Sequence, residues 1–178
     1  MAKISFFSIQ VKQMQQASPT AIARILDANL NRAREGLRTV EEWCRFGLNH
    51  QHWAEECKQL RQALAPWHQD DLRAARDTPN DVGTQLTHPQ ESQRADVRAL
   101  LQANLCRVEE ALRVLEEYGK LRDSAMGACC KQLRYRVYAL ESELLGNKLV
   151  QMLKQCSLYL VTSPQENLLA TVEASLQG

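Results

Sequence analysis

The sequence is poor in the residues and motifs that mark several common fold and function classes. Glycine occurs 7 times and proline 5 times in 178 residues, too few for an all-β fold built on many tight turns. Neither a Walker A motif nor a G-x-G-x-x-G motif is present, so a bound phosphate would be held by side chains. The net charge is only +1, which provides no overall field to attract nucleic acid or an anionic membrane.

Metal-binding cysteine pairs and long apolar runs are also missing. The six cysteines stand at positions 44, 57, 106, 129, 130 and 156, and none has C-x-x-C spacing, which argues against a structural zinc site. Reduced thiols are typical of the cytosol. No run is apolar enough to cross a bilayer, and the first residues lack the apolar length of a signal peptide. We therefore expect a cytoplasmic protein with neither a nucleic-acid nor a membrane partner.

The strongest positive feature is an internal repeat. Residues 26–42 and 101–117 are identical at ten of seventeen positions. A shorter match follows each copy, because residues 57–61 and 130–134 both read Cys-Lys-Gln-Leu-Arg. Chance does not produce this agreement, and it indicates that a unit of two helices was duplicated.

Apolar residues recur at helical spacing in all four predicted helices. Their steps of three and four predict one buried face on each helix. The stripes are Leu26, Leu30, Ala33, Leu37, Val40 and Cys44; Trp53, Cys57, Leu60 and Leu64; Leu101, Leu105, Val108, Leu112 and Leu115; and Met126, Cys130, Leu133, Val137, Leu140 and Leu144. We predict an all-α fold in which a duplicated helical hairpin forms a four-helix core with pseudo-two-fold symmetry.

Serine and proline signals set the expected boundaries. Ser18 precedes Pro19 and predicts a helix start with a serine cap, whereas Pro66 is expected to end the second helix. The pair His88–Pro89 marks the next helix start. We expect an N-terminal extension over residues 1–17 and a helical domain over 18–153, with units of about 18–76 and 89–153 joined by a linker at 77–88.

The pattern changes near the end of the sequence. Residues 158–162 form a short β-type run, and Ser163–Pro164 opens an apolar helical pattern. A strand followed by a helix begins an α/β unit, and one such unit cannot form a sheet alone. We expect residues 157–178 to be the first strand and helix of a truncated second domain.

Ten polar residues recur between the copies and are the candidates for substrate binding. They are Asn29, Arg32, Glu35, Arg38 and Glu42, and their partners Asn104, Arg107, Glu110, Arg113 and Glu117. Arginine suits phosphate, and the glutamates, Glu35 and Glu110 in particular, suit Mg²⁺. The competing interpretation is a solvated helix face of i,i+3 and i,i+4 ion pairs. The persistence of these polar residues through duplication favours a shared function, most strongly for the asparagines, which gain nothing from helix propensity.

The repeated motif carries a resemblance to a known family. Ala28-Asn29-x-x-Arg32-x-x-Glu35-Gly36-Leu37-Arg38-x-x-Glu41 and its copy ending in Glu117-Tyr118-Gly119-Lys120 resemble the helical N-terminal domain of the long bacterial form of thiamine-phosphate synthase. Residues 158–178 resemble the first strand and helix of that enzyme's (β/α)₈ barrel. The resemblance covers about residues 20–178.

The resemblance implies a place in thiamine biosynthesis. The full-length parent would be a transferase that joins hydroxymethylpyrimidine pyrophosphate to thiazole phosphate, giving thiamine monophosphate with Mg²⁺. The barrel residues that perform this step follow the first helix and are not in this sequence, so we expect no synthase reaction from this chain. The helical domain would bind hydroxymethylpyrimidine phosphate or phosphorylate it with ATP. The alternative is a non-catalytic dimerisation or regulatory module, and a homodimer is left open.

Overall fold

The computed structural model describes residues 18–84, 86, 93–146, 169 and 172–174. The chain divides into two compact units, Met1–Leu145 and Gly146–Gly178. In the second unit, the described residues 169 and 172–174 are helical, and the predicted strand at 158–162 lies outside the described residues, as does the extension at 1–17. No strand occurs among the described residues, so the all-α prediction is confirmed for that part of the chain.

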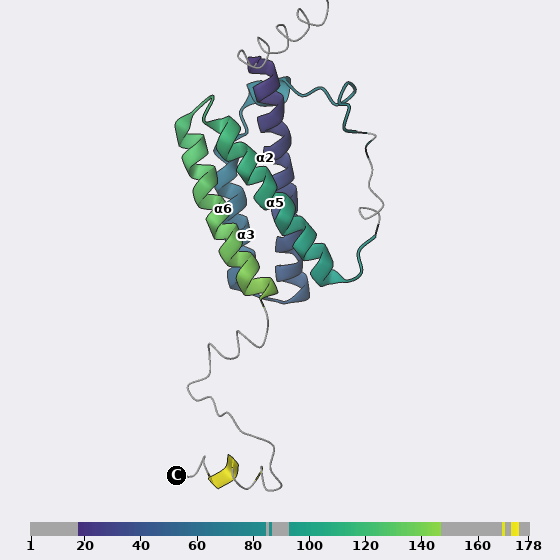
Figure 1. Cartoon of the computed structure of the whole chain (residues 1–178), viewed down its shortest axis with the longest axis vertical. Coiled ribbons are helices and arrows are strands. Elements are labelled where there is room, and N and C mark those ends of the chain that lie inside the picture. Colours follow the sequence, from purple (N-terminus) through teal and green to yellow (C-terminus); the bar gives the residue numbers. More distant parts are fainter. Residues whose placement is uncertain (1–17, 85, 87–92, 147–168, 170–171, 175–178) are drawn as a thin grey trace, which may run out of the picture. The chain divides into compact units, whose positions relative to one another are not determined.

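The first unit contains, in its described part, four long helices (Figure 1). They are α2 (Pro19–Glu42), α3 (Gln51–Leu64), α5 (Val97–Gly119) and α6 (Ser124–Leu145). Three short elements join them: a π-helical turn η1 (Trp43–Gly47), a 3₁₀ turn η2 (Ala65–Trp67) and α4 (Asp70–Ala74). The two long helices of each predicted unit are therefore present, whereas the sequence patterns did not predict η1 or α4.

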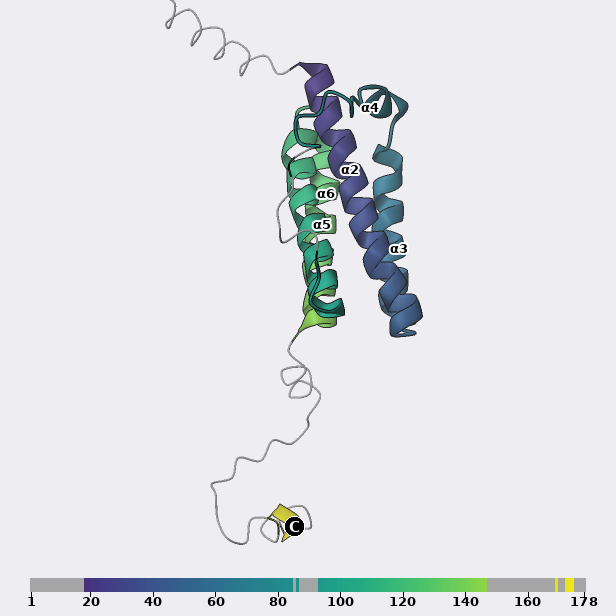
Figure 2. The same ribbon diagram turned by 90° about the vertical axis from the view of Figure 1, so that its right-hand side faces the viewer.

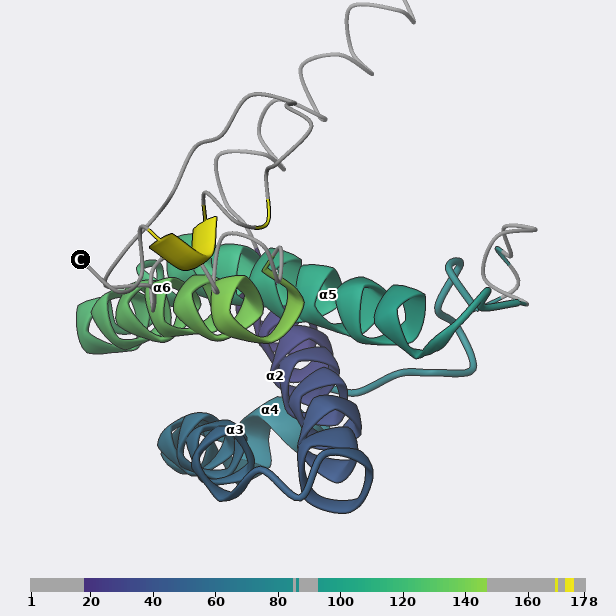
Figure 3. The ribbon, with the colours of Figure 1, turned by 90° about the horizontal axis from the view of Figure 1, so that it is seen from below.

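Helix α2 is the central element of the bundle. It packs against α3 on one side and most extensively against α5, which in turn packs against α6. Figures 2 and 3 show α2 lying between α3 and the α5–α6 pair. Helices α3 and α6 meet mainly through polar contacts: Arg136 donates twice to the Glu56 carboxylate at 2.9 Å, and the Trp53 indole donates to Glu143 at 3.0 Å.

The predicted apolar stripes form this core. Of the predicted core residues, all are buried except Trp53 and Leu144, which are partly buried and pack against the others. Leu72 of α4 adds to the core from the connecting segment and is 1% exposed. Burial of some twenty apolar side chains, each contributing about 1.5–3 kcal/mol, supplies the main driving force for folding.

Helix ends follow the predicted signals in most places. Ser18 is the N-cap residue of α2 and Pro19 stands in the first turn, as predicted, but the Ser18 side chain makes no capping hydrogen bond. Helix α3 ends at Leu64, and Pro66 falls in the 3₁₀ turn that follows it. Helix α5 begins at Val97, where the Asp96 carboxylate accepts from the Ala99 amide at 2.7 Å. The expected start at residues 88–89 lies outside the described residues.

Gly36 allows α2 and α5 to approach closely. A Cβ atom at this position would lie 2.7 Å from Val108 Cγ2 and 3.1 Å from the Asn104 carbonyl oxygen. The carbonyl belongs to the α5 backbone and cannot rotate away, so a larger side chain would push the two helices apart. The absence of a side chain at Gly36 therefore sets the spacing of the α2–α5 interface.

An ion pair with a buried glutamate joins the two helices of each hairpin. Glu41 of α2 accepts from Arg61 of α3, and Glu116 of α5 accepts from Arg134 of α6 at 2.7 Å. The two glutamates are each 4% exposed. The arginine lowers the pKa of Glu116, although burial opposes this change. Both members of each pair come from the repeated motifs, so these contacts explain why Glu41 and Arg61 recur.

Two carboxyl groups meet where α5 packs on α6. Burial, followed by the negative charge of Glu141 and a hydrogen bond with it, raises the pKa of Glu109 to about 7. The positive charge of Arg134 on α6 opposes this rise in pKa. The negative charge of Glu110, which follows Glu109 on α5, adds to it. The Glu109 carboxyl therefore keeps its proton in the folded protein at pH values where it loses it in the unfolded chain.

We predict that the buried glutamate stabilises the fold far more than its exposed neighbour. Replacing Glu116 by Ala leaves the Arg134 guanidinium buried without its partner, and should lower the free energy of unfolding by about 3 kcal/mol. The matched change Glu117→Ala removes pairs with Arg113 and Lys120 at a half-exposed site and should cost about 0.5 kcal/mol. Urea unfolding of both variants measures the difference, and equal losses would contradict the assigned role of the pair.

We also predict a pH effect from Glu109. Its raised pKa favours the protonated folded state, so its contribution to stability falls as pH rises from the ordinary pKa, near 4.5, to about 7. The Glu109→Gln variant lacks this fall, and its stability relative to the parent protein should increase between pH 5 and 8. Urea unfolding across this pH interval tests the effect, with the exposed Glu55→Gln as control. A constant difference across the interval would refute it.

Candidate functional site

A cleft lies along the outer side of the α2–α5 interface, and we call it the α2–α5 cleft. Its volume is about 690 Å³. Five lining residues come from each helix: Asn29, Arg32, Glu35, Gly36 and Thr39 of α2, and Asn104, Arg107, Glu110, Ala111 and Val114 of α5. Each residue from α5 stands 75 positions after its counterpart from α2, so the two copies of the repeated motif contribute equally to the walls.

The structure divides the ten predicted site residues into two groups. Six of them line the cleft: Asn29, Arg32, Glu35, Asn104, Arg107 and Glu110. The other four form ion pairs outside it, between Arg38 and Glu42 and, at 3.2 Å, between Arg113 and Glu117. The solvated-face interpretation therefore fits the second group, and a binding role remains a prediction for the first.

The charged side chains of the cleft are not paired with one another. Arg32, Glu35, Arg107 and Glu110 are exposed and make no ion pair within the described residues. The pair between Arg32 and Glu35 that ordinary i,i+3 spacing would allow does not form. Arg32 has only a long hydrogen bond, 3.5 Å, to the amide oxygen of Asn29. The guanidinium and carboxylate groups thus face solvent in the cleft and are free to bind a solute.

The two asparagines are held in the same way. Asn29 Nδ2 donates to the Ile25 carbonyl at 2.8 Å, and Asn104 Nδ2 donates to the Leu100 carbonyl at 2.9 Å. Each bond reaches back one turn along its own helix and fixes the amide orientation. Each amide oxygen is thereby directed away from the helix carbonyl and can accept a hydrogen bond. These bonds give a structural reason for the recurrence of asparagine, in addition to any contact with a ligand.

The cleft supplies donors for an anion and a few oxygen ligands for a cation. Two arginines, one from each helix, can donate in bidentate fashion to phosphate. Among the described residues there is no cluster of three His, Cys, Asp or Glu side chains that could hold a metal. Glu35 and Glu110 could bind Mg²⁺ only together with phosphate oxygens and water, which is how this ion is commonly held. The donor set therefore suits Mg²⁺ bound with a phosphorylated ligand.

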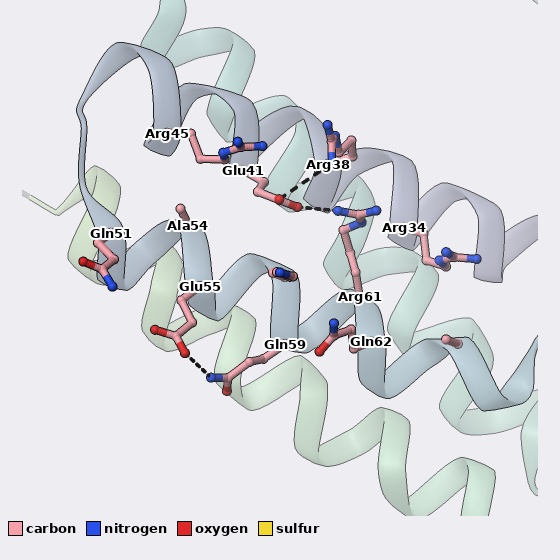
Figure 4. Close-up of a pocket in the computed structure, with 12 residues that line it drawn as sticks. Arg34, Arg38, Glu41, Arg45, Gln51, Ala54, Glu55, Gln59, Arg61 and Gln62 are labelled. Atoms are coloured by element: carbon pink, nitrogen blue, oxygen red, sulfur yellow. Dashed lines mark hydrogen bonds and ion pairs between the residues drawn. The ribbon is translucent and has the colours of Figure 1, made fainter.

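The sequence patterns missed a second concave surface, between α2 and α3, which we call the α2–α3 groove (Figure 4). Its volume is about 850 Å³. Its basic lining comes from Arg34, Arg38, Arg45, Lys58 and Arg61. Arg34 and Arg45 do not recur as arginine in the second copy, so a search for repeated residues passes over them. The signal that could have found the groove is the helical spacing of arginines at 34, 38 and 45.

A search of the described residues finds no helix long and apolar enough to span a bilayer.

Comparisons with known proteins give a consistent picture. The chain is 90% identical over 165 residues to a thiamine-phosphate synthase of Synechocystis sp., an alignment that covers 93% of the chain and 48% of that protein. It is 64% identical over 169 residues to a thiamine-phosphate synthase of Nostoc sp., covering 95% of the chain and 47% of the relative. The chain thus spans about half the length of these curated relatives. No solved structure shows significant similarity to it.

The ThiD2 family matches residues 24–143. This range begins in α2, ends in α6 and contains every residue of the α2–α5 cleft, and it covers more than half of the chain. The chain therefore belongs to the ThiD2 family.

Proposed function

We propose that the chain serves thiamine biosynthesis as the helical part of a thiamine-phosphate synthase, and that its α2–α5 cleft binds hydroxymethylpyrimidine phosphate. Relatives up to 90% identical to the chain are thiamine-phosphate synthases, which supports this pathway. Family membership over residues 24–143 identifies the helical bundle as the common element. In the cytoplasm the complete protein would join the pyrimidine pyrophosphate to thiazole phosphate.

One observation carries the binding proposal. Of the ten predicted site residues, the six at the α2–α5 cleft are free of ion pairs, whereas the four outside it are paired. Ligand binding removes water from the two guanidinium groups and the two carboxylates. The free-energy cost of this desolvation is small only if the ligand provides both negative and positive charge. A phosphorylated pyrimidine with Mg²⁺ meets this requirement.

Each group in the cleft has a role in this proposal. Arg32 and Arg107 would grip the phosphate from opposite helices, because guanidinium matches phosphate in a bidentate geometry. The amide oxygens of Asn29 and Asn104 would accept from the amino group of the pyrimidine ring. Glu35 and Glu110 would hold Mg²⁺ beside the phosphate, where it neutralises charge.

A kinase reaction is the finer part of the proposal. A phosphate oxygen of hydroxymethylpyrimidine phosphate would attack the γ-phosphorus of ATP, the bond to the bridging oxygen would break, and ADP would leave. Positioning and charge neutralisation provide most of the catalysis in such transfers. The arginines of the cleft are suited to bring the two phosphate groups together. No glycine-rich loop is needed for this chemistry.

We further propose that α2–α3 and α5–α6 are copies of one ancestral hairpin related by a pseudo-two-fold axis through the α2–α5 interface. The repeated sequence supports this origin, as does the recurrence of the buried glutamate–arginine pair. Residues 157–178 would then begin the synthase barrel with its first strand and helix. A symmetric cleft formed by two copies of a motif is a natural place for one asymmetric ligand to bind.

We predict that hydroxymethylpyrimidine phosphate with Mg²⁺ raises the melting temperature of the chain. A ligand at about 100 times its Kd adds about 2.7 kcal/mol of stability. The double variant Arg32→Gln with Arg107→Gln should fold as well as the parent and lose this protection. Arg113→Gln, which removes an arginine already paired outside the cleft, is the matched control and should keep it. Protection that survives in the double variant would place the ligand elsewhere.

We predict turnover by ³¹P NMR when ATP, Mg²⁺ and hydroxymethylpyrimidine phosphate are added to the chain. The diphosphate signals of the pyrimidine pyrophosphate should appear, and Glu35→Gln with Glu110→Gln should slow their appearance at least tenfold by weakening Mg²⁺ binding. Ligand protection without turnover would limit the cleft to binding. Neither protection nor turnover from folded protein would favour a dimerisation or regulatory module.

A further inference from the structure

The α2–α3 groove is a basic surface distinct from the cleft. Positions 34, 38, 41 and 45 form one stripe along α2 and η1, and they face α3 across the groove (Figure 4). At 100° per residue, the centre of this stripe lies about 150° around the α2 axis from that of the cleft residues. The same helix therefore presents two separate polar surfaces, one toward each neighbour.

Positive charge is in excess in the groove. The lining has five cations, Arg34, Arg38, Arg45, Lys58 and Arg61, and two carboxylates, Glu41 and Glu55. Arg38 is also paired with Glu42, which lies outside the groove, so the excess positive charge is +2. Figure 4 shows Arg38 and Arg61 both directed at Glu41, so one carboxylate is shared by two guanidinium groups. The other three cations have no carboxylate partner within the described residues.

Two guanidinium groups in the groove have donors without acceptors. The Nε–H groups of Arg34 and Arg61 are both buried and donate to no atom of the described chain. A buried donor without a partner costs free energy and is rare in folded proteins. Burial is the main cause that lowers the pKa of His68, and the positive charge of Arg34 lowers it further. Because neither Nε atom is accessible to solvent, an anion in the groove would contact the terminal nitrogens of these guanidinium groups instead.

The second hairpin offers an internal comparison. Arg134, which corresponds to Arg61, lies under the rings of Tyr135 and Tyr138, with its guanidinium carbon 5.2 and 5.5 Å from their centroids. It also donates to the Tyr138 hydroxyl at 3.0 Å. Its side chain is 10% exposed, against 23% for Arg61. The aromatic rings therefore close the second hairpin over its arginine.

The first hairpin is open at the same positions. Gln62 and Ala65 stand 73 positions before the two tyrosines, and neither covers Arg61 with a ring. Arg34 has Glu109 as its counterpart in the second copy, where the charge is reversed. Four of the five groove cations have basic counterparts in the second copy: Arg113, Lys120, Lys131 and Arg134. The first hairpin differs in combining the extra arginine with the missing rings.

We propose that the α2–α3 groove is a second ligand site, which binds the phosphate chain of a polyphosphate anion. Arg34 and Arg45 stand eleven residues apart, about 16 Å along the helix, so the cations line an elongated surface that a single phosphate would not fill. Arg34 and Lys58 bind the chain from opposite helices. No aromatic residue lines the groove to stack on a base. The groove would therefore recognise inorganic polyphosphate and the phosphate chain of a nucleotide through the same contacts.

Isothermal titration calorimetry of the whole 178-residue chain at low ionic strength tests this site. Tripolyphosphate, ATP and inorganic phosphate serve as probes, each without Mg²⁺. We expect one site per chain, with tripolyphosphate bound at least tenfold more tightly than inorganic phosphate. Equal affinity for tripolyphosphate and ATP would identify the phosphate chain as the whole ligand, and tighter binding of ATP would identify a nucleotide as its source. The absence of tripolyphosphate binding would overturn the proposal.

Variants place the binding on the groove. Arg34→Gln should weaken tripolyphosphate roughly tenfold, the loss of one charge-assisted contact. Gln62→Tyr with Ala65→Tyr copies the closed hairpin and should abolish binding. Lys131→Gln, at the position that corresponds to Lys58 in the other hairpin, is the matched control and should bind normally. An equal loss in Lys131→Gln would show attraction by overall charge and overturn the site.

Two further measurements keep the outcomes separate. Thermal unfolding followed by circular dichroism checks that each variant is folded, and Arg34→Gln alone decides the matter if the tyrosine variant is not. The cleft variant Arg32→Gln with Arg107→Gln should bind tripolyphosphate normally. If this cleft variant loses tripolyphosphate binding and the groove variants keep it, the anion occupies the cleft and the proposed groove site is wrong. These measurements can therefore refute the groove site without refuting the proposed function of the cleft. They can equally refute the function of the cleft without refuting the groove site.

Discussion

The buried glutamate–arginine pair inside each hairpin fixes how the rest of the bundle is arranged. Glu116 and Arg134 are both buried between α5 and α6, where an unpaired charge would be strongly unfavourable. The pair therefore forms only when α5 and α6 are in the correct rotation and register, and Glu41 with Arg61 imposes the same condition on α2 and α3. Once both hairpins are fixed, their remaining apolar faces can meet in only a narrow range of geometries.

The close contact between α2 and α5 turns two helices into the walls of a cleft. Gly36 lets the helices approach, and Ala111 at the matching position of α5 is also small and buried. Polar residues one turn away on each helix then stand opposite each other along the outer edge of the interface. The α2–α5 cleft is thus a consequence of small residues at the interface together with polar residues beside it, and it needs no loop to form it.

Helix α2 has a different role on each of its sides. Its apolar stripe enters the core, its asparagine, arginine and glutamate stripe lines the cleft, and its arginine-rich stripe lines the α2–α3 groove. Helix α5 keeps the first two stripes but has Glu109 where α2 has Arg34. The two hairpins have therefore kept a common cleft and diverged on their outer surfaces. Under our two proposals, this divergence would separate a binding site built by both hairpins from one that belongs to the first hairpin alone.

The sequence by itself determined the helices, their buried stripes and the set of polar residues that recur. Helical periodicity is a local property. A leucine every three or four residues predicts a buried helix face without specifying which element packs against it. It could not distinguish Arg32 and Glu35 from Arg38 and Glu42, because both pairs have spacing that allows contact on an isolated helix. Only the packing of α5 on α2 decided that the first pair lines a cleft while the second forms an ion pair. Likewise, the closure of one arginine by tyrosines and the exposure of the other follow from contacts between helices, which local spacing does not encode.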